Sequence, residues 1–262
     1  MFRSLYTAAS GMTAQQTNLD NVANNLSNAN TAGFRKRRVQ FQDLVYQNVI
    51  TPGAANTQQT VSAGLQIGLG TRTAATEVLQ SQGDFQQTGN PLDLAIQGNG
   101  YFQVMTPSGQ TAYTRAGSFH LDSQGNIVTA DGDPLQPSLT IPSDATSITV
   151  GADGTVSVTQ PGKTTSQQIG QIQLATFPNP GGLNSVGSNL LLPTSSSGDA
   201  ITGNPGGSEG LGTLLQGSLE QSNVNTVEEF IQMILAQRSY EANSQVAKAA
   251  DQMFQETNQL GK

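Results

Sequence analysis

The chain has 262 residues, of which only 11% are charged, and its net charge is −7. That length is enough for one large domain or two smaller ones, and the acidic balance argues against sequence-independent binding to nucleic acid, which needs a basic surface. The absence of cysteine excludes disulfides and thiolate chemistry, and no apolar run approaches the roughly 18 residues of a membrane-spanning helix.

Residues 4–28 are predicted to form a helix. Apolar residues recur there at alternating steps of three and four, which is the spacing of a coiled-coil seam. Asn28, Asn30 and Gly33 are typical of a helix end. The seam contains Leu5, Ala8, Met12, Gln15, Leu19, Val22 and Leu26.

The other face of this helix carries almost no charge, because Asp20 is the only charged residue between Ser4 and Asn28. A second stripe at helical spacing consists of Asn18, Asn21, Asn25 and Asn28. Asn is a weak helix former, so the helix has little intrinsic support without a partner. Two interpretations of the stripe are open: a solvated polar face, or amides that hydrogen-bond to neighbouring helices in an assembly.

Residues 34–72 are predicted to form an extended or hairpin-like arm. The arm starts with the one basic cluster of the chain, residues 35–38. Such a cluster can bind nucleic acid or anionic lipid. On an acidic chain it is more often a salt-bridging patch, here facing acidic residues of a neighbouring subunit. The candidate arm residues are Arg35, Arg37, Arg38, Gln66 and Ile67.

Residues 73–221 are predicted to be rich in β-structure. The alternating residues 92–96, the glycine-containing turn at 97–100 and the apolar residues 101–104 have the signature of a hairpin. Loops are expected over the Gly-, Ser- and Pro-rich residues 178–213. Further short strands are predicted at 111–119, 127–130, 148–150 and 156–158.

Residues 226–260 are predicted to form the second long helix. Thr226 and Glu229 fit a capping box at its start. Phe230 and Ile234 widen its apolar seam at the start. The seam recurs at steps of three, four and seven and contains Ile231, Leu235, Ala242, Val246, Ala249, Met253 and Leu260.

The predicted fold is mixed α and β, with long N- and C-terminal helices pairing as a coiled-coil-like layer, a central β-rich domain and an extended arm. Residues 1–33 and 222–262 would form a terminal helical assembly domain, 34–72 the arm and 73–221 the β-rich domain. Both seams would be buried if the ends packed on each other and on copies of the chain. The candidate self-assembly residues are Leu5, Met12, Leu19, Val22, Leu26, Ile231, Leu235, Val246, Met253 and Leu260.

No catalytic group pairs convincingly with another. His120 and Asp122 would share one face of a strand, as a base and its orienting carboxylate do, but a strand-edge histidine beside a turn aspartate looks the same. Asp131 could start a calcium loop, yet Leu135 occupies its third ligand position. We therefore expect no enzyme and no catalytic, cofactor-binding or metal-binding residues.

Several motifs resemble those of the flagellar basal-body rod and hook family. The N-terminal one runs from Ser10 to Phe34, and the C-terminal one from Gly217 to Met253. In the centre, residues 93–102 and 113–119 also resemble the family. The similarity covers nearly the whole chain. The length of the chain and the arm with its Gly64–Gly70 stretch favour a distal rod subunit, with a proximal rod or hook subunit as the alternative.

The resemblance implies a structural subunit of the bacterial flagellar distal rod, which assembles helically into a rigid hollow drive shaft and transmits torque to the hook. The implied partners are copies of itself, proximal rod subunits, hook subunits, the L and P ring proteins and the flagellar export apparatus, with no cofactor and no nucleic acid.

The implied location is the flagellum basal body, where the rod lies in the periplasm and reaches the outer membrane. Export without a cleaved signal peptide is expected, because no apolar stretch follows Arg3. The alternative from another class is a secreted β-rich enzyme or adhesin, which would need paired carboxylates in a cleft and a conventional export signal.

Overall fold

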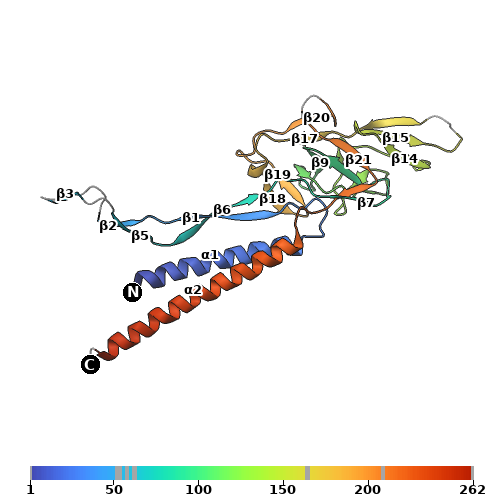
Figure 1. Ribbon diagram of the computed structural model, residues 1–262. Helices are drawn as coiled ribbons and strands as arrows, with labels where there is room; N and C mark the ends of the chain where they lie inside the picture. The colour runs from blue at the N-terminus through green and yellow to red at the C-terminus, as the bar shows by residue number, and fades with distance from the viewer. Residues whose placement is uncertain are drawn as a thin grey trace. The chain divides into compact units, whose positions relative to one another are not determined.

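The computed structural model describes residues 2–50, 55–56, 59–60, 64–162, 166–207 and 210–260. It places a helix at each end of the chain and β-structure between them (Figure 1). The chain divides into two compact units. The helical unit contains Met1–Ser27, Arg37–Glu77 and Asn225–Lys262, and the β-rich unit contains Asn28–Lys36 and Val78–Val224. These boundaries place residues 28–36 with the β-structure and residues 37–77 with the helices.

The helical unit is built on α1 (Phe2–Ser27) and α2 (Thr226–Leu260). The two helices pack antiparallel, because the end of α1 lies beside the start of α2. The predicted range of α2 is confirmed. The predicted capping residue, Thr226, is wrong. The Asn225 side chain, rather than that of Thr226, accepts the N–H groups of Val227 and Glu228, at 3.0 and 3.4 Å.

The described residues between 37 and 78 include paired strands. β1 (Arg37–Asp43) pairs with β6 (Thr71–Val78), and β2 (Gln47–Ile50) pairs antiparallel with β5 (Leu65–Ile67). We call the pairs β1–β6 and β2–β5 the ribbon. The ribbon covers most of the predicted arm, and β1 packs against α1. Residues 51–54, 57–58 and 61–63 of that arm lie outside the described part of the chain. The remaining pair is β3 (Ala55–Asn56) with β4 (Gln59–Thr60).

The β-rich unit centres on a seven-stranded sheet. Its main path runs β18-β19-β10-β9-β17-β20, and β13 also pairs with β9. Three of these strands lie within residues 178–213, so the prediction of loops there is wrong. The strands are β9 (Tyr101–Met105), β10 (Thr111–Thr114), β13 (Leu135–Gln136), β17 (Leu174–Thr176), β18 (Asn184–Gly187), β19 (Leu190–Leu192) and β20 (Ile201–Gly203).

Smaller antiparallel groups surround this sheet. β14 (Ser147–Val150), β15 (Thr155–Thr159) and β16 (Gln167–Gln171) form a three-stranded sheet. The other elements are the pair β7 (Phe85–Gln87) with β22 (Ser218–Glu220), the pair β8 (Leu94–Gln97) with β21 (Thr213–Gln216), the pair β11 (His120–Leu121) with β12 (Ile127–Val128), and the 3₁₀ turn Pro180–Gly182.

The predicted hairpin of residues 92–104 is wrong. β8 pairs with β21, more than a hundred residues later in the chain, while β9 pairs with β10, β13 and β17. At the turn between β8 and β9, the Arg115 side chain donates hydrogen bonds to the carbonyl groups of Ile96, Gly98 and Gly100. A side chain thus occupies the acceptors around this turn.

Strand β9 contributes to two apolar clusters, one on each face, because successive residues of a strand point to opposite sides. Phe102 and Val104 lie in the main core, where the Phe102 ring meets that of Phe119 edge-to-face at 5.1 Å. Tyr101 lies in a second cluster, in which Phe177 meets Tyr113 at 4.8 Å. The central sheet is therefore covered on both faces.

Candidate assembly surface

Helix α2 packs on α1 through a seven-residue repeat of small and polar residues. Glu229, Ala236 and Ala250 of this repeat are almost fully buried, with 1–2% of each exposed. Asn243, the remaining member, lies beside Gly11, and a Cβ at Gly11 would lie 2.8 Å from the Asn243 Nδ2 atom. Small side chains at this contact therefore allow the two helices to approach closely.

The predicted apolar seam of α2 lies on a different face and is exposed. Ile231, Leu235, Val246 and Met253 each expose 49–59% of their surface. An uncovered row of large apolar residues is typical of an interaction surface. The side chain of Leu260, also predicted to belong to this seam, lies outside the described residues. We call the exposed row the α2 stripe; it comprises Val227, Phe230, Ile231, Ile234, Leu235, Val246 and Met253.

The predicted seam of α1 is mostly covered inside the helical unit. Val22 is buried, and the other candidates are half-buried. Ala8 and Ala14 are buried as well. The apolar residues of α1 therefore contribute to the packing of the isolated chain. The half-buried candidates are Leu5, Met12, Leu19 and Leu26.

Several hydroxyl groups of α1 bond to the backbone of their own helix. The hydroxyl groups of Thr7, Thr13 and Ser27 each donate a hydrogen bond to the backbone carbonyl four residues earlier. The Thr17 hydroxyl does the same to Thr13. Because these hydroxyls are satisfied within the helix, their burial against a partner would leave no new donor unpaired.

Asn25 joins α1, α2 and the ribbon within the helical unit. Its side chain is 1% exposed. The Nδ2 group donates to the Arg37 carbonyl at 2.9 Å and to the Glu229 carboxylate at 3.1 Å, while Oδ1 accepts the Arg37 N–H at 3.0 Å. Asn21 donates to the same Arg37 carbonyl at 2.8 Å. Two amides of the Asn stripe therefore bond inside their own chain rather than face solvent.

The arm candidates lie in different surroundings. Arg37 enters the Asn25 network through its backbone, and Arg38 forms an exposed ion pair with Glu77 at 2.9 Å, which keeps the pKa of Glu77 below its usual value. Gln66 and Ile67 lie on β5, opposite Asn48 and Gln47 of β2. Arg35 belongs to the other unit.

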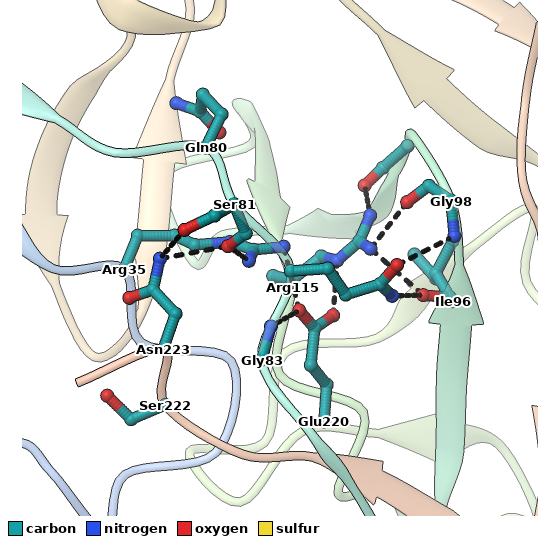
Figure 2. Close-up of polar contacts among 12 residues, drawn as sticks. Arg35, Gln80, Ser81, Gly83, Ile96, Gly98, Arg115, Glu220, Ser222 and Asn223 are labelled. Carbon is teal, nitrogen blue, oxygen red and sulfur yellow. Dashed lines mark hydrogen bonds and ion pairs between the residues drawn. The ribbon is translucent and has the colours of Figure 1, made fainter. Parts of the chain in front are cut away.

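Arg35 and Arg115 share one carboxylate in the β-rich unit (Figure 2). Glu220 is 2% exposed and Arg115 6%. The Glu220 carboxylate accepts the Arg115 Nε–H at 2.6 Å and lies 2.8 Å from the Arg35 Nη2 atom. The structure thus pairs Arg35 and Arg38 with carboxylates of the same chain, whereas the sequence suggested carboxylates of a neighbouring subunit.

Burial dominates the electrostatics of this cluster. Desolvation lowers the pKa of Arg35, and the Glu220 charge opposes that shift. Burial also raises the pKa of Tyr101, whose hydroxyl donates to Gln80 at 3.0 Å. Sequence reasoning missed Arg115 and Glu220. One signal was available: Arg115 is the only lysine or arginine between Arg72 and Lys163.

The polar groups considered for catalysis serve local turns. The Asp122 carboxylate accepts the backbone N–H groups of Gln124 and Asn126, both at 2.8 Å, while His120 is exposed on β11. The turn that contains Asp131, the candidate start of a calcium loop, is closed by the backbone N–H of Asp133, which donates to the Thr129 hydroxyl at 3.1 Å. Among the described residues, no group of three or more His, Cys, Asp or Glu residues could hold a metal ion. Neither described helix is long and apolar enough to cross a membrane.

Comparison with known families gives matches along the chain. Residues 5–35 match the family described as "Flagella basal body rod protein". Residues 95–158 match "Flagellar hook protein FlgE/F/G D1 domain", and residues 215–260 match "Flagellar basal body rod FlgEFG protein C-terminal".

Several curated proteins are similar over their full length. The flagellar basal-body rod protein FlgG of Caulobacter vibrioides is 48% identical over 98% of this chain and 99% of that protein. The FlgG proteins of Borreliella burgdorferi and Bacillus subtilis are 46% and 44% identical, each with at least 98% of both chains covered. The flagellar hook protein FlgE of Borreliella burgdorferi is 39% identical, but over 49% of this chain and 29% of the hook protein.

Proposed function

Because this chain belongs to the flagellar basal-body rod protein family, as a structural subunit of the distal rod, we propose that it assembles helically with copies of itself into a rigid hollow shaft that transmits torque to the hook. The observation that carries this proposal is the α2 stripe, which remains exposed although α2 is already packed on α1. Burial of such side chains contributes about 25 cal/mol per Å² of apolar surface.

The proposed occupant of the α2 stripe is α1 of a second copy. On its exposed side that helix offers Ala9, Thr13, Ala23 and Ser27, and the two hydroxyls already bond to the helix backbone, so large apolar residues can pack at these positions without leaving a hydroxyl donor unpaired. The stripe and this face are different surfaces of the molecule. A contact between unlike surfaces is heterologous, and repeating one that does not close into a ring produces a filament.

The family also supports proposals on location and partners. We place the subunit in the basal-body rod within the periplasm, between proximal rod subunits and hook subunits, with the L and P ring proteins around it. Passage through the flagellar export apparatus as an unfolded chain fits the low charge and absent cysteine. The full-length match to rod proteins favours the rod over the hook, because the hook protein matches half of this chain.

The assembly surface can be tested with a charge in the α2 stripe. We expect Val246→Asp to block rod assembly while the subunit remains folded, because Val246 is exposed in the isolated chain and buried in the proposed contact. Gln255→Asp is the matched control, because Gln255 is exposed and, nine residues beyond Val246, lies on the opposite side of the helix at about 3.6 residues per turn. Electron microscopy of isolated basal bodies and swimming in soft agar measure assembly, and circular dichroism measures folding.

Normal rods from Val246→Asp would reject the stripe as an assembly surface. If Gln255→Asp lost rod assembly to the same extent, any added charge on α2 would interfere with assembly, which also contradicts the proposal.

A further inference from the structure

Glu220 lies where three distant parts of the β-rich unit meet (Figure 2). Its backbone carbonyl accepts the N–H of Gly33 at 2.8 Å, and its carboxylate accepts the N–H of Gly83 at 3.1 Å, besides binding Arg35 and Arg115. A Cβ at Gly83 would lie 2.0 Å from the backbone oxygen of Gln221. The chain around Glu220 therefore fits closely against segments from the beginning and the middle of the unit.

The same segment provides partner strands for earlier parts of the unit. β21 pairs with all four residues of β8, and β22 pairs with β7. The Gln216 side chain accepts the N–H of Val150 at 3.1 Å and donates to the Ile148 carbonyl at 3.0 Å, which joins β21 to β14. We call residues 213–224 the closing segment.

The closing segment also provides the carboxylate of Glu220, which pairs with two buried arginines. Arg115 lies buried against the carbonyl groups of Ile96, Gly98 and Gly100, and its Nε–H is bound by Glu220. Without Glu220, the buried guanidinium groups of Arg35 and Arg115 would lose the carboxylate they share. Leaving an ion buried without its partner is strongly unfavourable. A folded unit that lacks the closing segment would therefore lose stability for two reasons: β7 and β8 would lack their partner strands, and Arg35 and Arg115 would lack their carboxylate.

We propose that the closing segment completes the β-rich unit, that the unit has no stable folded form without it, and that Glu220 makes this closure depend on charge. A chain that emerges with its N-terminus first, from a ribosome or through a channel, then keeps this unit open until most of its length has emerged. This closure is a property of a single folding chain and does not depend on the proposed assembly.

Native-state hydrogen exchange on the full-length chain tests closure directly. In rising urea, amides of β8, β9, β10, β21 and β22 are expected to reach the same opening free energy, because these strands can open only together. The proposal is overturned if amides of β21 and β22 exchange through a smaller opening while those of β9 and β10 stay protected. In that case the unit persists without its closing segment.

Full-length variants test the role of charge. Glu220→Gln should accelerate exchange in β9 and β10 by at least about tenfold, because the two arginines lose their shared counter-ion. Adding Arg35→Met to Glu220→Gln should slow exchange again, since one of the two uncompensated cations is gone.

The matched control is Glu77→Gln, which removes an exposed carboxylate from its ion pair with Arg38 and should change exchange less than about twofold. Unchanged exchange in Glu220→Gln, or a further acceleration on adding Arg35→Met, would contradict a charge-dependent closure.

Discussion

The side-chain amide of Asn25 serves the backbone of β1 and the first turn of α2 at the same time. A buried amide in a helix pair fixes the register of its neighbours, because sliding either element would leave polar groups without partners. At the scale of single residues, the helical unit is therefore specified by polar contacts at one end of the helix pair, while small residues allow close approach farther along.

Replacing Asn25 should destabilise the helical unit. We expect Asn25→Leu to lower the free energy of unfolding by about 1–3 kcal/mol, because the N–H and carbonyl of Arg37 lose hydrogen bonds in a buried site. Urea unfolding followed by helical circular dichroism measures the change. Gln16→Leu, at an exposed position of α1, is the control and should have little effect. Equal stability of Asn25→Leu and the unchanged chain would contradict this role.

Acid should weaken the turn after β11. The Asn126 side chain, helped by backbone N–H groups, keeps the pKa of Asp122 below its ordinary value. Because the folded pKa is the lower one, the stabilisation is complete above the unfolded pKa of about 3.9 and is lost as the pH falls through the folded value. When urea unfolding is measured between pH 6 and pH 2.5, the free energy of unfolding should fall less steeply with acid for Asp122→Asn than for the unchanged chain. The same pH dependence in both proteins would contradict a stabilising role of the Asp122 carboxylate.

At the scale of elements, α2 has two faces with opposite chemistry. The face on α1 consists of small and polar residues, and the α2 stripe carries the large apolar ones. A helix that keeps its most apolar face uncovered gains little from packing on its own chain. We therefore expect the free subunit to order its helix pair weakly and the assembled subunit to order it fully, since ordering costs about 1–2 kcal/mol per residue.

Adjacent residues of α2 can test which face packs on α1. Ala236 is buried and Leu235 is exposed. Ala236→Leu should destabilise the helix pair by about 1–3 kcal/mol through overpacking, whereas Leu235→Ala should leave the isolated chain nearly unchanged. Thermal unfolding followed by circular dichroism compares the two. The opposite order of effects would show that the α2 stripe, not the repeat containing Ala236, packs on α1.

At the scale of the whole molecule, the two units differ in how much apolar surface they bury within the chain. The β-rich unit buries a large apolar cluster of its own, while much of the apolar surface of α2 is exposed. We expect the first to fold alone and the second to need neighbours that cover its stripe. We expect a division in which the β-rich unit stays constant while the helical unit changes from weakly ordered to ordered on assembly.

Removing the terminal helices should leave a folded monomer. A fragment of residues 28–224 should be soluble and show sharp amide signals in nuclear magnetic resonance, because it retains Arg35, Glu220 and every strand of the β-rich unit. A second fragment starting at Arg38 lacks Arg35 and the bond from Gly33, and should unfold at lower urea concentration. An unfolded 28–224 fragment would show that the β-rich unit needs the helices.

Shortening the ribbon should make the shaft more flexible. The ribbon exposes Val45, Tyr46 and Val49, which suits burial against neighbouring subunits. Deleting residues between Tyr46 and Ala63 should remove part of that contact and increase bending of isolated rods in electron micrographs. A deletion of equal length in the turns of the β-rich unit is the control. Unchanged bending after shortening the ribbon would reject a stiffening role.

The sequence by itself determined both terminal helices, the bounds of α2 and the β-rich centre. Spacing of apolar residues and turn chemistry act over a few positions, so they can be read locally. Only the tertiary structure decided that β8 pairs with β21, that Glu220 joins Arg35 to Arg115, and that α2 turns its small residues toward α1. These contacts depend on close packing and on ion pairs between residues far apart in the chain, so the local spacing of apolar residues cannot predict them.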